Sequence, residues 1–141
     1  MRIFNPGTIA KPGSNYSHGA LFANDGQHLV IAGQVGIAPD GKLEQGFEAQ
    51  SRRAWSNLFA VLEEAGMTKR NLVKVVVFVT LPGVTAQYRA IRDEVLEGHK
   101  PPMTYLVVSG LAAPEMLVEI EGEAFRETPA VRRRPRSGSE R

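Results

Sequence analysis

The order of apolar and polar residues divides the chain into strands and helices. Near the N-terminus, three short apolar segments separated by turn residues are predicted as strands, at residues 2–5, 20–23 and 29–38. Residues 72–81 contain five valines and are apolar almost throughout, which is typical of a central strand covered on both faces. The last two predicted strands are residues 104–108 and 116–125.

Two segments have the spacing of helices. In residues 46–65, apolar side chains recur every three or four positions, and Gly66 is a suitable residue to end a helix. The second helix is predicted to begin soon after Pro82-Gly83 and to end near Gly98, before two consecutive prolines. Its polar side is predicted to carry Arg89 and Arg92.

This order of elements predicts an α+β sandwich, with two helices on one face of a mixed six-stranded sheet. Two helices leave the other face of such a sheet largely uncovered. Because the segment at 72–81 is apolar on both sides, we expect an oligomer in which a second copy buries that face.

Composition and missing motifs exclude several kinds of chemistry. The sequence has no cysteine, so disulfides, thiolate metal sites and a cysteine nucleophile are excluded. Its three histidines are far apart and are predicted to be surface residues, and neither a metal site nor a cofactor is expected. Neither a signal peptide nor an apolar run long enough to span a bilayer is present, and we expect a cytoplasmic protein.

The basic charge of the chain belongs to its C-terminal end. Of 17 basic and 15 acidic residues, five arginines and one glutamate follow Thr128, so 12 basic and 14 acidic residues remain before it. We therefore predict a domain over residues 1–127 and a disordered basic tail over residues 128–141. We interpret the tail as solubilising rather than as an RNA-binding or DNA-binding arm, because its arginines are not interleaved with aromatic residues.

The last predicted strand carries a row of acidic residues. Since side chains alternate along a strand, Glu119, Glu121 and Glu123 share one face, and apolar residues occupy the other. This pattern is typical of a solvated outer face. A second interpretation is that one of the three carboxylates lies partly desolvated in a cleft between subunits and moves protons.

Several short stretches together resemble the RidA (YjgF) family. They are Asn15-Tyr16-Ser17-His18-Gly19, the I-x-G-Q piece at Ile31–Gln34, the L-E-x-A-G piece at Leu62–Gly66, the valine-rich segment at Val75–Val79, and V-E-I-E at Val118–Glu121. Each piece alone is weak, but their order is specific, and the match runs to about Arg126. The resemblance implies a chorismate-mutase-like fold, a homotrimer with clefts between subunits, and cofactor-independent hydrolysis of reactive enamines and imines to keto acids and ammonia.

The resemblance also implies roles for individual residues. Tyr16 matches the tyrosine of the family's cleft, and Glu119 matches the glutamate that positions or activates the attacking water. Gly33 and Gln34 match a turn beside the pocket. Ala32 stands where many members of the family have a serine.

One departure from the family pattern lies in the strand that begins near residue 103. Deaminating members carry an arginine that holds the substrate carboxylate where this chain has Met103, and methionine offers neither charge nor donors. Thr104 and Tyr105 are predicted to contact substrate beside it. A replacement cation could come from the second helix or from the segment after it, at Arg89, Arg92, His99 or Lys100.

Three functions follow from this reading. The first is an enamine or imine hydrolase with altered substrate choice, acting on a neutral or differently anchored imine. The second is a non-catalytic small-molecule binder, and the third is an RNA-binding or endoribonuclease-like protein. We favour the first, with a second copy of the chain and a small molecule as partners, and expect neither a nucleic acid nor a membrane as a partner.

Overall fold

Helices and strands alternate along residues 1–129, which are the residues that the computed structural model describes. The strands are β1 (Arg2–Phe4), β2 (Gly19–Leu21), β3 (Gly26–Val35), β4 (Leu72–Val79), β5 (Met103–Val107) and β6 (Val118–Glu127). The helices are α1 (Phe47–Glu64), the short 3-10 turn η1 (Lys69–Asn71) and α2 (Thr85–Leu96). Apart from η1, this is the predicted order of elements. The predicted tail at 128–141 lies outside the described residues except for its first two.

The main sheet has four strands in the order β3-β6-β4-β5. Strand β6 is antiparallel to both β3 and β4, and β5 returns parallel to β4 after α2, so the sheet is mixed. The predicted α+β class is therefore confirmed, but the prediction of six strands in one sheet is wrong, because β1 and β2 form a separate ribbon.

Prolines explain why the N-terminal ribbon does not join the sheet. The chain after β1 touches the edge of β5 through a single bridge between Ser17 and Pro102, and the N–H of Ser17 donates to the carbonyl oxygen of Pro101 at 3.3 Å. A proline has no N–H to donate, so a ladder cannot continue along Pro101 and Pro102. The contact nevertheless holds the N-terminal loop beside the start of β5.

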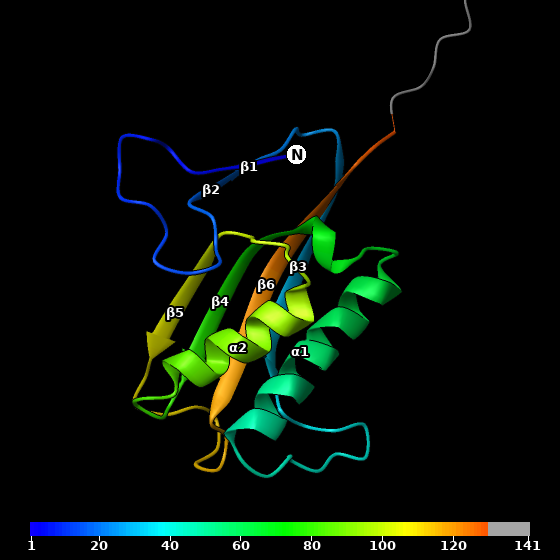
Figure 1. Cartoon of the computed structure of the whole chain (residues 1–141). Helices are drawn as coiled ribbons and strands as arrows, with labels where there is room; N and C mark the ends of the chain where they lie inside the picture. Colours follow the sequence, from blue (N-terminus) through cyan, green and yellow to red (C-terminus); the bar gives the residue numbers. More distant parts are fainter. Residues whose placement is uncertain (130–141) are drawn as a thin grey trace, which may run out of the picture.

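Both helices cover the same face of the four-stranded sheet (Figure 1). On β6, Val118, Ile120 and Ala124 are fully buried beneath them, so the residues between, including Glu119, point to the uncovered face. The core between sheet and helices contains Trp55, Leu58 and Leu62 of α1, together with apolar residues of β4 and α2.

Strand β4 shows the same asymmetry. Val75, Val77 and Val79 are fully buried, whereas Val76 and Phe78 on the other face remain partly exposed. The described residues of a single copy therefore cover the central strand on one face only. A second copy covering the other face stays a prediction.

His99 is buried rather than on the surface, which corrects the sequence-based prediction. The residue is 8% exposed, and its Nε2 lies 3.0 Å from the carbonyl oxygen of Leu72. Burial lowers the pKa of His99 below its ordinary value, and Arg70 acts in the same direction, while the hydrogen bond to Leu72 opposes them. His99 is thus a structural link between the end of α2 and the start of β4.

Candidate functional site

A pocket lies between α2, the start of β5 and the N-terminal loop. Its volume is about 180 Å³. Aromatic rings, a thioether, two hydroxyls and two guanidinium groups line it, and they belong to Ser14, Tyr16, Thr85, Tyr88, Arg89, Arg92, Met103 and Tyr105. Four of the predicted site residues, Tyr16, Arg89, Met103 and Tyr105, are thus brought together here.

The alternation of β5 determines which of its side chains reach this pocket. Met103 and Tyr105 pair with the buried Val75 and Val77 of β4, so they point toward α2. The ring of Tyr88 lies 5.2 Å from that of Tyr105 between centroids, and its hydroxyl donates to Sδ of Met103 at 3.5 Å. Burial raises the pKa of Tyr88 far above its ordinary value, so the phenol stays neutral.

The two arginines of the pocket differ in their charge environment. Arg92 is 3% exposed, and its Nε and Nη2 contact Oδ1 of Asp93 at 2.9 and 2.8 Å. Its Nη1 also donates to Oγ of Ser14 at 3.4 Å. Arg89 is exposed and forms no ion pair with any residue of the described part of the chain. Arg92 therefore neutralises Asp93, whereas the charge of Arg89 is free.

Tyr16 is positioned by contacts of the N-terminal loop with α2. Beside it, Nδ2 of Asn15 donates to Oδ2 of Asp93 at 3.0 Å, so Asp93 holds both Arg92 and the loop. The ring of Tyr16 is stacked on His18, with centroids 5.7 Å apart and planes 4° apart. These contacts fix the phenol as one wall of the pocket.

Glu119 lies on the other side of the sheet. In the register it pairs with Val35 of β3 and Phe78 of β4, and its side chain points to the uncovered face. Its carboxylate lies over Gly33, where an added Cβ would be only 2.0 Å from Oε1 of Glu119. Within residues 1–129, the carboxylate has no hydrogen-bond or ion-pair partner, so its oxygens are free to accept a proton or a hydrogen bond.

The residues around Gly33 follow from an irregularity in the sheet. The register between β3 and β6 shifts between Ile31 and Gln34, so Ala32 and Gly33 bulge beside Glu119. The side-chain amide of Gln34 donates to the carbonyl oxygen of Ala32 at 3.0 Å, which braces the bulge. Three more predicted site residues, Ala32, Gly33 and Gln34, are thus grouped near Glu119.

Thr104 is separated from its neighbours in β5. It lies between Met103 and Tyr105 and points to the opposite face, where its hydroxyl accepts a hydrogen bond from Nζ of Lys74 at 3.1 Å. The sheet therefore separates the predicted site residues. Tyr16, Arg89, Met103 and Tyr105 lie on the helix side, whereas Ala32 and Thr104 share the uncovered side with Glu119, whose carboxylate lies over Gly33. Gln34 pairs with the buried Ile120, which faces the helices.

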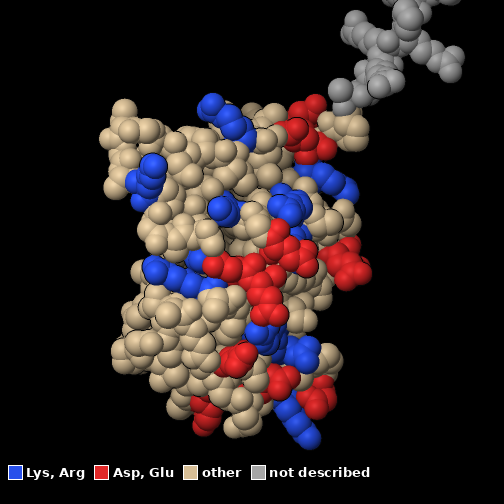
Figure 2. All heavy atoms as spheres, viewed as in Figure 1, with Lys and Arg blue, Asp and Glu red and all other residues tan. Residues whose placement is uncertain are grey.

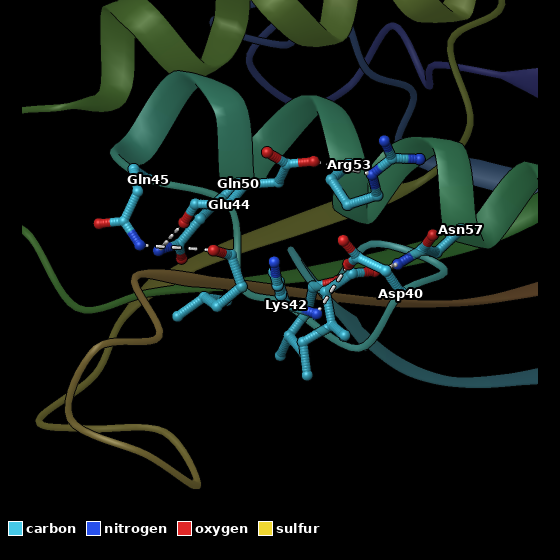
Figure 3. Close-up of polar contacts among 10 residues, drawn as sticks. Asp40, Lys42, Glu44, Gln45, Gln50, Arg53 and Asn57 are labelled. Atoms are coloured by element: carbon cyan, nitrogen blue, oxygen red, sulfur yellow. Dashed lines mark hydrogen bonds and ion pairs between the residues drawn. The ribbon is translucent and has the colours of Figure 1, made fainter.

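Polar side chains of α1 bind the end of β3, the loop that follows it and the segment before β6 (Figure 3). Asn57 donates to the carbonyl oxygens of Val35 and Ile37 at 3.1 and 2.9 Å. The buried Gln50 donates to the carbonyl oxygens of Glu44 and Glu115 at 3.1 and 3.0 Å, and accepts from the N–H of Leu117 at 2.8 Å. Through these bonds α1 ties the end of β3 to the start of β6.

No group of three His, Cys, Asp or Glu side chains within residues 1–129 is arranged to hold a metal ion. None of the helices described there is both long enough and apolar enough to cross a membrane.

Comparison with known proteins identifies the family of this chain. A family model described as Endoribonuclease L-PSP matches residues 8–125. The chain belongs to the Endoribonuclease L-PSP family. A RutC family protein of Pyrococcus abyssi is 32% identical over 104 residues, which cover 72% of this chain and 81% of that protein. A RutC family protein of Synechocystis is 30% identical over 124 residues, covering 86% and 93%.

Solved structures of this family share the fold. The crystal structure of the Rid family protein YyfB from Yersinia pestis matches with a TM-score of 0.76 and 32% identity, covering 89% of this chain and 98% of that one. A protein of Thermotoga maritima, described as a putative endoribonuclease, matches with a TM-score of 0.68 and 28% identity, covering 91% and 99%. The resemblance to the RidA family is therefore confirmed.

Three pocket residues were not among the predicted site residues: Ser14, Thr85 and Tyr88. Arg92 was predicted as a possible replacement cation, but on the polar side of its helix, which is wrong, since it is buried. A signal was available, because Arg92 follows the buried Tyr88 by four residues and so lies on the same side of the helix. The hydroxyls of Ser14 and Thr85 gave no such signal.

Proposed function

We propose that this chain is a cofactor-independent hydrolase of small imines or enamines, with a site completed between copies of a homotrimer. In this proposal the uncovered face bearing Glu119 of one copy lies against the helix-side pocket of another. The observation that carries the proposal is the free carboxylate of Glu119 over the Gly33 bulge, on a sheet face that no element within residues 1–129 covers. Membership of the L-PSP family supports it.

The proposed reaction needs one group that handles protons at the reacting carbon. The carboxylate of Glu119 accepts a proton from water as the water oxygen bonds to the imine carbon, and the C=N electron pair moves to nitrogen. Returning that proton to nitrogen gives a carbinolamine, which collapses to a carbonyl compound and releases ammonia. Water and imine are the only reactants consumed. Tyr16, as a pocket wall, orients the substrate.

Replacing Glu119 by glutamine tests this role because glutamine keeps the size of the side chain and removes the basic carboxylate. We expect the enzymatic acceleration of keto-acid release from imines generated in solution to fall about 10²–10⁴-fold. Glu121→Gln is the matched control, since Glu121 lies two residues along the same face. Equal rates for wild type and Glu119→Gln across a panel of imines would refute the assignment.

A non-catalytic small-molecule binder is the second candidate. It is favoured by one observation: the pocket is formed within a single copy and lies across the sheet from Glu119, so binding does not require the carboxylate. A binder would take up ligand in the pocket and show no acceleration of imine hydrolysis. Titration with ligand and the rate assay on the same preparation therefore distinguish the two candidates.

The family description and the names of two structural relatives contain the word endoribonuclease. For this chain we favour a small molecule over RNA for two reasons. The pocket, at about 180 Å³, has room for only a small molecule. On the helix-covered face, acidic and basic side chains are interspersed (Figure 2), unlike the continuous basic surface that tracks a phosphate backbone. A cytoplasmic location stays a prediction.

A further inference from the structure

We infer that the helix-side pocket binds a small carboxylate with a flat apolar body, and that Arg89 anchors its charge. The inference rests on the proposed function for the reaction that follows, but binding itself needs only residues of the pocket. It gives the pocket a ligand class and makes Arg89 on α2 the residue that determines specificity. In deaminating members of the family this role belongs to an arginine at the strand position that is Met103 here.

The charge of the pocket favours an anion. Its lining contains two charged residues, Arg89 and Arg92, and both are cationic. The paired contacts with Asp93 neutralise Arg92 and hold it in place. Arg89 has no such partner among the described residues, so its guanidinium can form two parallel hydrogen bonds with a carboxylate.

The other candidate cations lie elsewhere. Ring nitrogen Nε2 of His99 already contacts the carbonyl oxygen of Leu72 at 3.0 Å. Lys100 does not line this pocket but a neighbouring cavity of the N-terminal loop, which shares Ser14 and Tyr16 with it. Of the four cations that could replace the family's arginine, the structure therefore leaves Arg89 as the free one at the pocket.

The uncharged part of the lining favours an apolar, flat ligand body. Tyr16, Tyr88 and Tyr105 present aromatic rings to the cavity, and Met103 adds a thioether whose sulfur accepts a hydrogen bond from Tyr88. Aromatic and thioether groups pack well against a planar apolar group. A ligand with a carboxylate at one end and such a group at the other matches both walls, whereas inorganic phosphate matches only the charge.

Carbon-13 labelling of methionine methyl groups provides a direct test. The chain has four methionines, so the spectrum of the full chain is simple, and only Met103 lines this pocket. The Glu119→Gln protein would be titrated with phenylacetate, with its uncharged isostere phenylacetamide, with acetate and with inorganic phosphate. We expect a saturable shift of the Met103 signal with phenylacetate, and binding of the other three compounds weaker by at least about tenfold.

Arg89→Gln should weaken phenylacetate binding by roughly 10- to 100-fold and leave phenylacetamide binding unchanged, because a hydrogen bond to a charged group is lost. Arg52→Gln is the matched control, since Arg52 is an exposed arginine on α1 that pairs with Glu48 and Glu94. Equal binding of acid and amide, an unchanged affinity in Arg89→Gln, or a shift at another methionine instead of Met103 would overturn the inference.

The outcome is separable from that of the proposed hydrolase. If phenylacetate binds through Arg89 but the wild-type protein does not accelerate imine hydrolysis, the inference stands and the proposed hydrolase fails. If hydrolysis depends on Glu119 but Arg89→Gln changes neither hydrolysis nor phenylacetate binding, the proposed hydrolase stands and the inference about Arg89 fails.

Discussion

Replacing Gly33 by alanine perturbs the proposed catalytic carboxylate without touching it directly. An added Cβ would lie 2.0 Å from Oε1, 2.8 Å from Cδ and 3.0 Å from Cγ of Glu119. Ordinary contact begins at 3.4 Å, so the oxygen must withdraw by about 1.4 Å. The backbone of Gly33 does not have a positive φ, so alanine fits the main chain and the clash falls on the end of one side chain.

The expected result is a loss of activity without a loss of stability. A displacement of about 1 Å in a catalytic group costs on the order of 10²-fold in rate, so kcat/KM for imine hydrolysis should fall by about that factor. The free energy of unfolding should change by no more than about 1 kcal/mol, since alanine also restricts the unfolded chain. Both quantities can be measured on one preparation, by keto-acid release and by denaturant titration.

Gly110→Ala is the matched control for this variant. Nothing lies within 4 Å of the Cβ that would be added at Gly110, and its φ is not positive. The control should retain wild-type rates. An active Gly33→Ala protein would contradict the view that the position of the Glu119 carboxylate determines the rate.

Three further predictions concern stability and charge. Gln50→Ala should lower the free energy of unfolding by about 2–4 kcal/mol in denaturant titration, because three backbone groups lose their partner, whereas exposed Gln45→Ala should be neutral. The pKa of His99 in the folded protein lies below its ordinary value of 6.5. The contribution of neutral His99 to the free energy of unfolding is therefore complete above pH 6.5 and is lost as the pH falls toward the folded-state pKa. His99→Gln should flatten that part of a stability–pH curve. Adding Met103→Arg to Arg89→Gln should restore phenylacetate binding, measured by calorimetry; no recovery would show that position 103 cannot hold the anion.

Much of the fold follows from the sequence because periodicity reports local geometry. The alternation in β6 correctly predicts that Glu119 and Glu121 share a face. It does not report which face the helices cover, since that depends on how distant elements pack. The six-stranded sheet was wrong because the apolar content of β1 and β2 resembles that of sheet strands, while the prolines at 101–102 limit their contact with the edge of β5.

The candidate site was predictable in its parts more than in its arrangement. Tyr16 and Met103 line one pocket of a single copy, and their roles toward a substrate stay predictions. That Thr104 points away from Met103 follows from strand alternation alone. The approach of Glu119 to Gly33 could not be predicted, because it depends on a register shift within β3 that leaves no signal in the residue pattern.

The central claim is that Glu119 of one copy acts on a ligand held in the pocket of another. Glu119→Gln and Tyr16→Ala chains, each inactive alone, would be co-expressed with different tags, and the mixed oligomers purified and assayed for imine hydrolysis. If each site takes Glu119 and the pocket from different copies, every mixed trimer contains one intact site out of three, giving about a third of wild-type activity. Mixed oligomers as inactive as their parents would contradict the account.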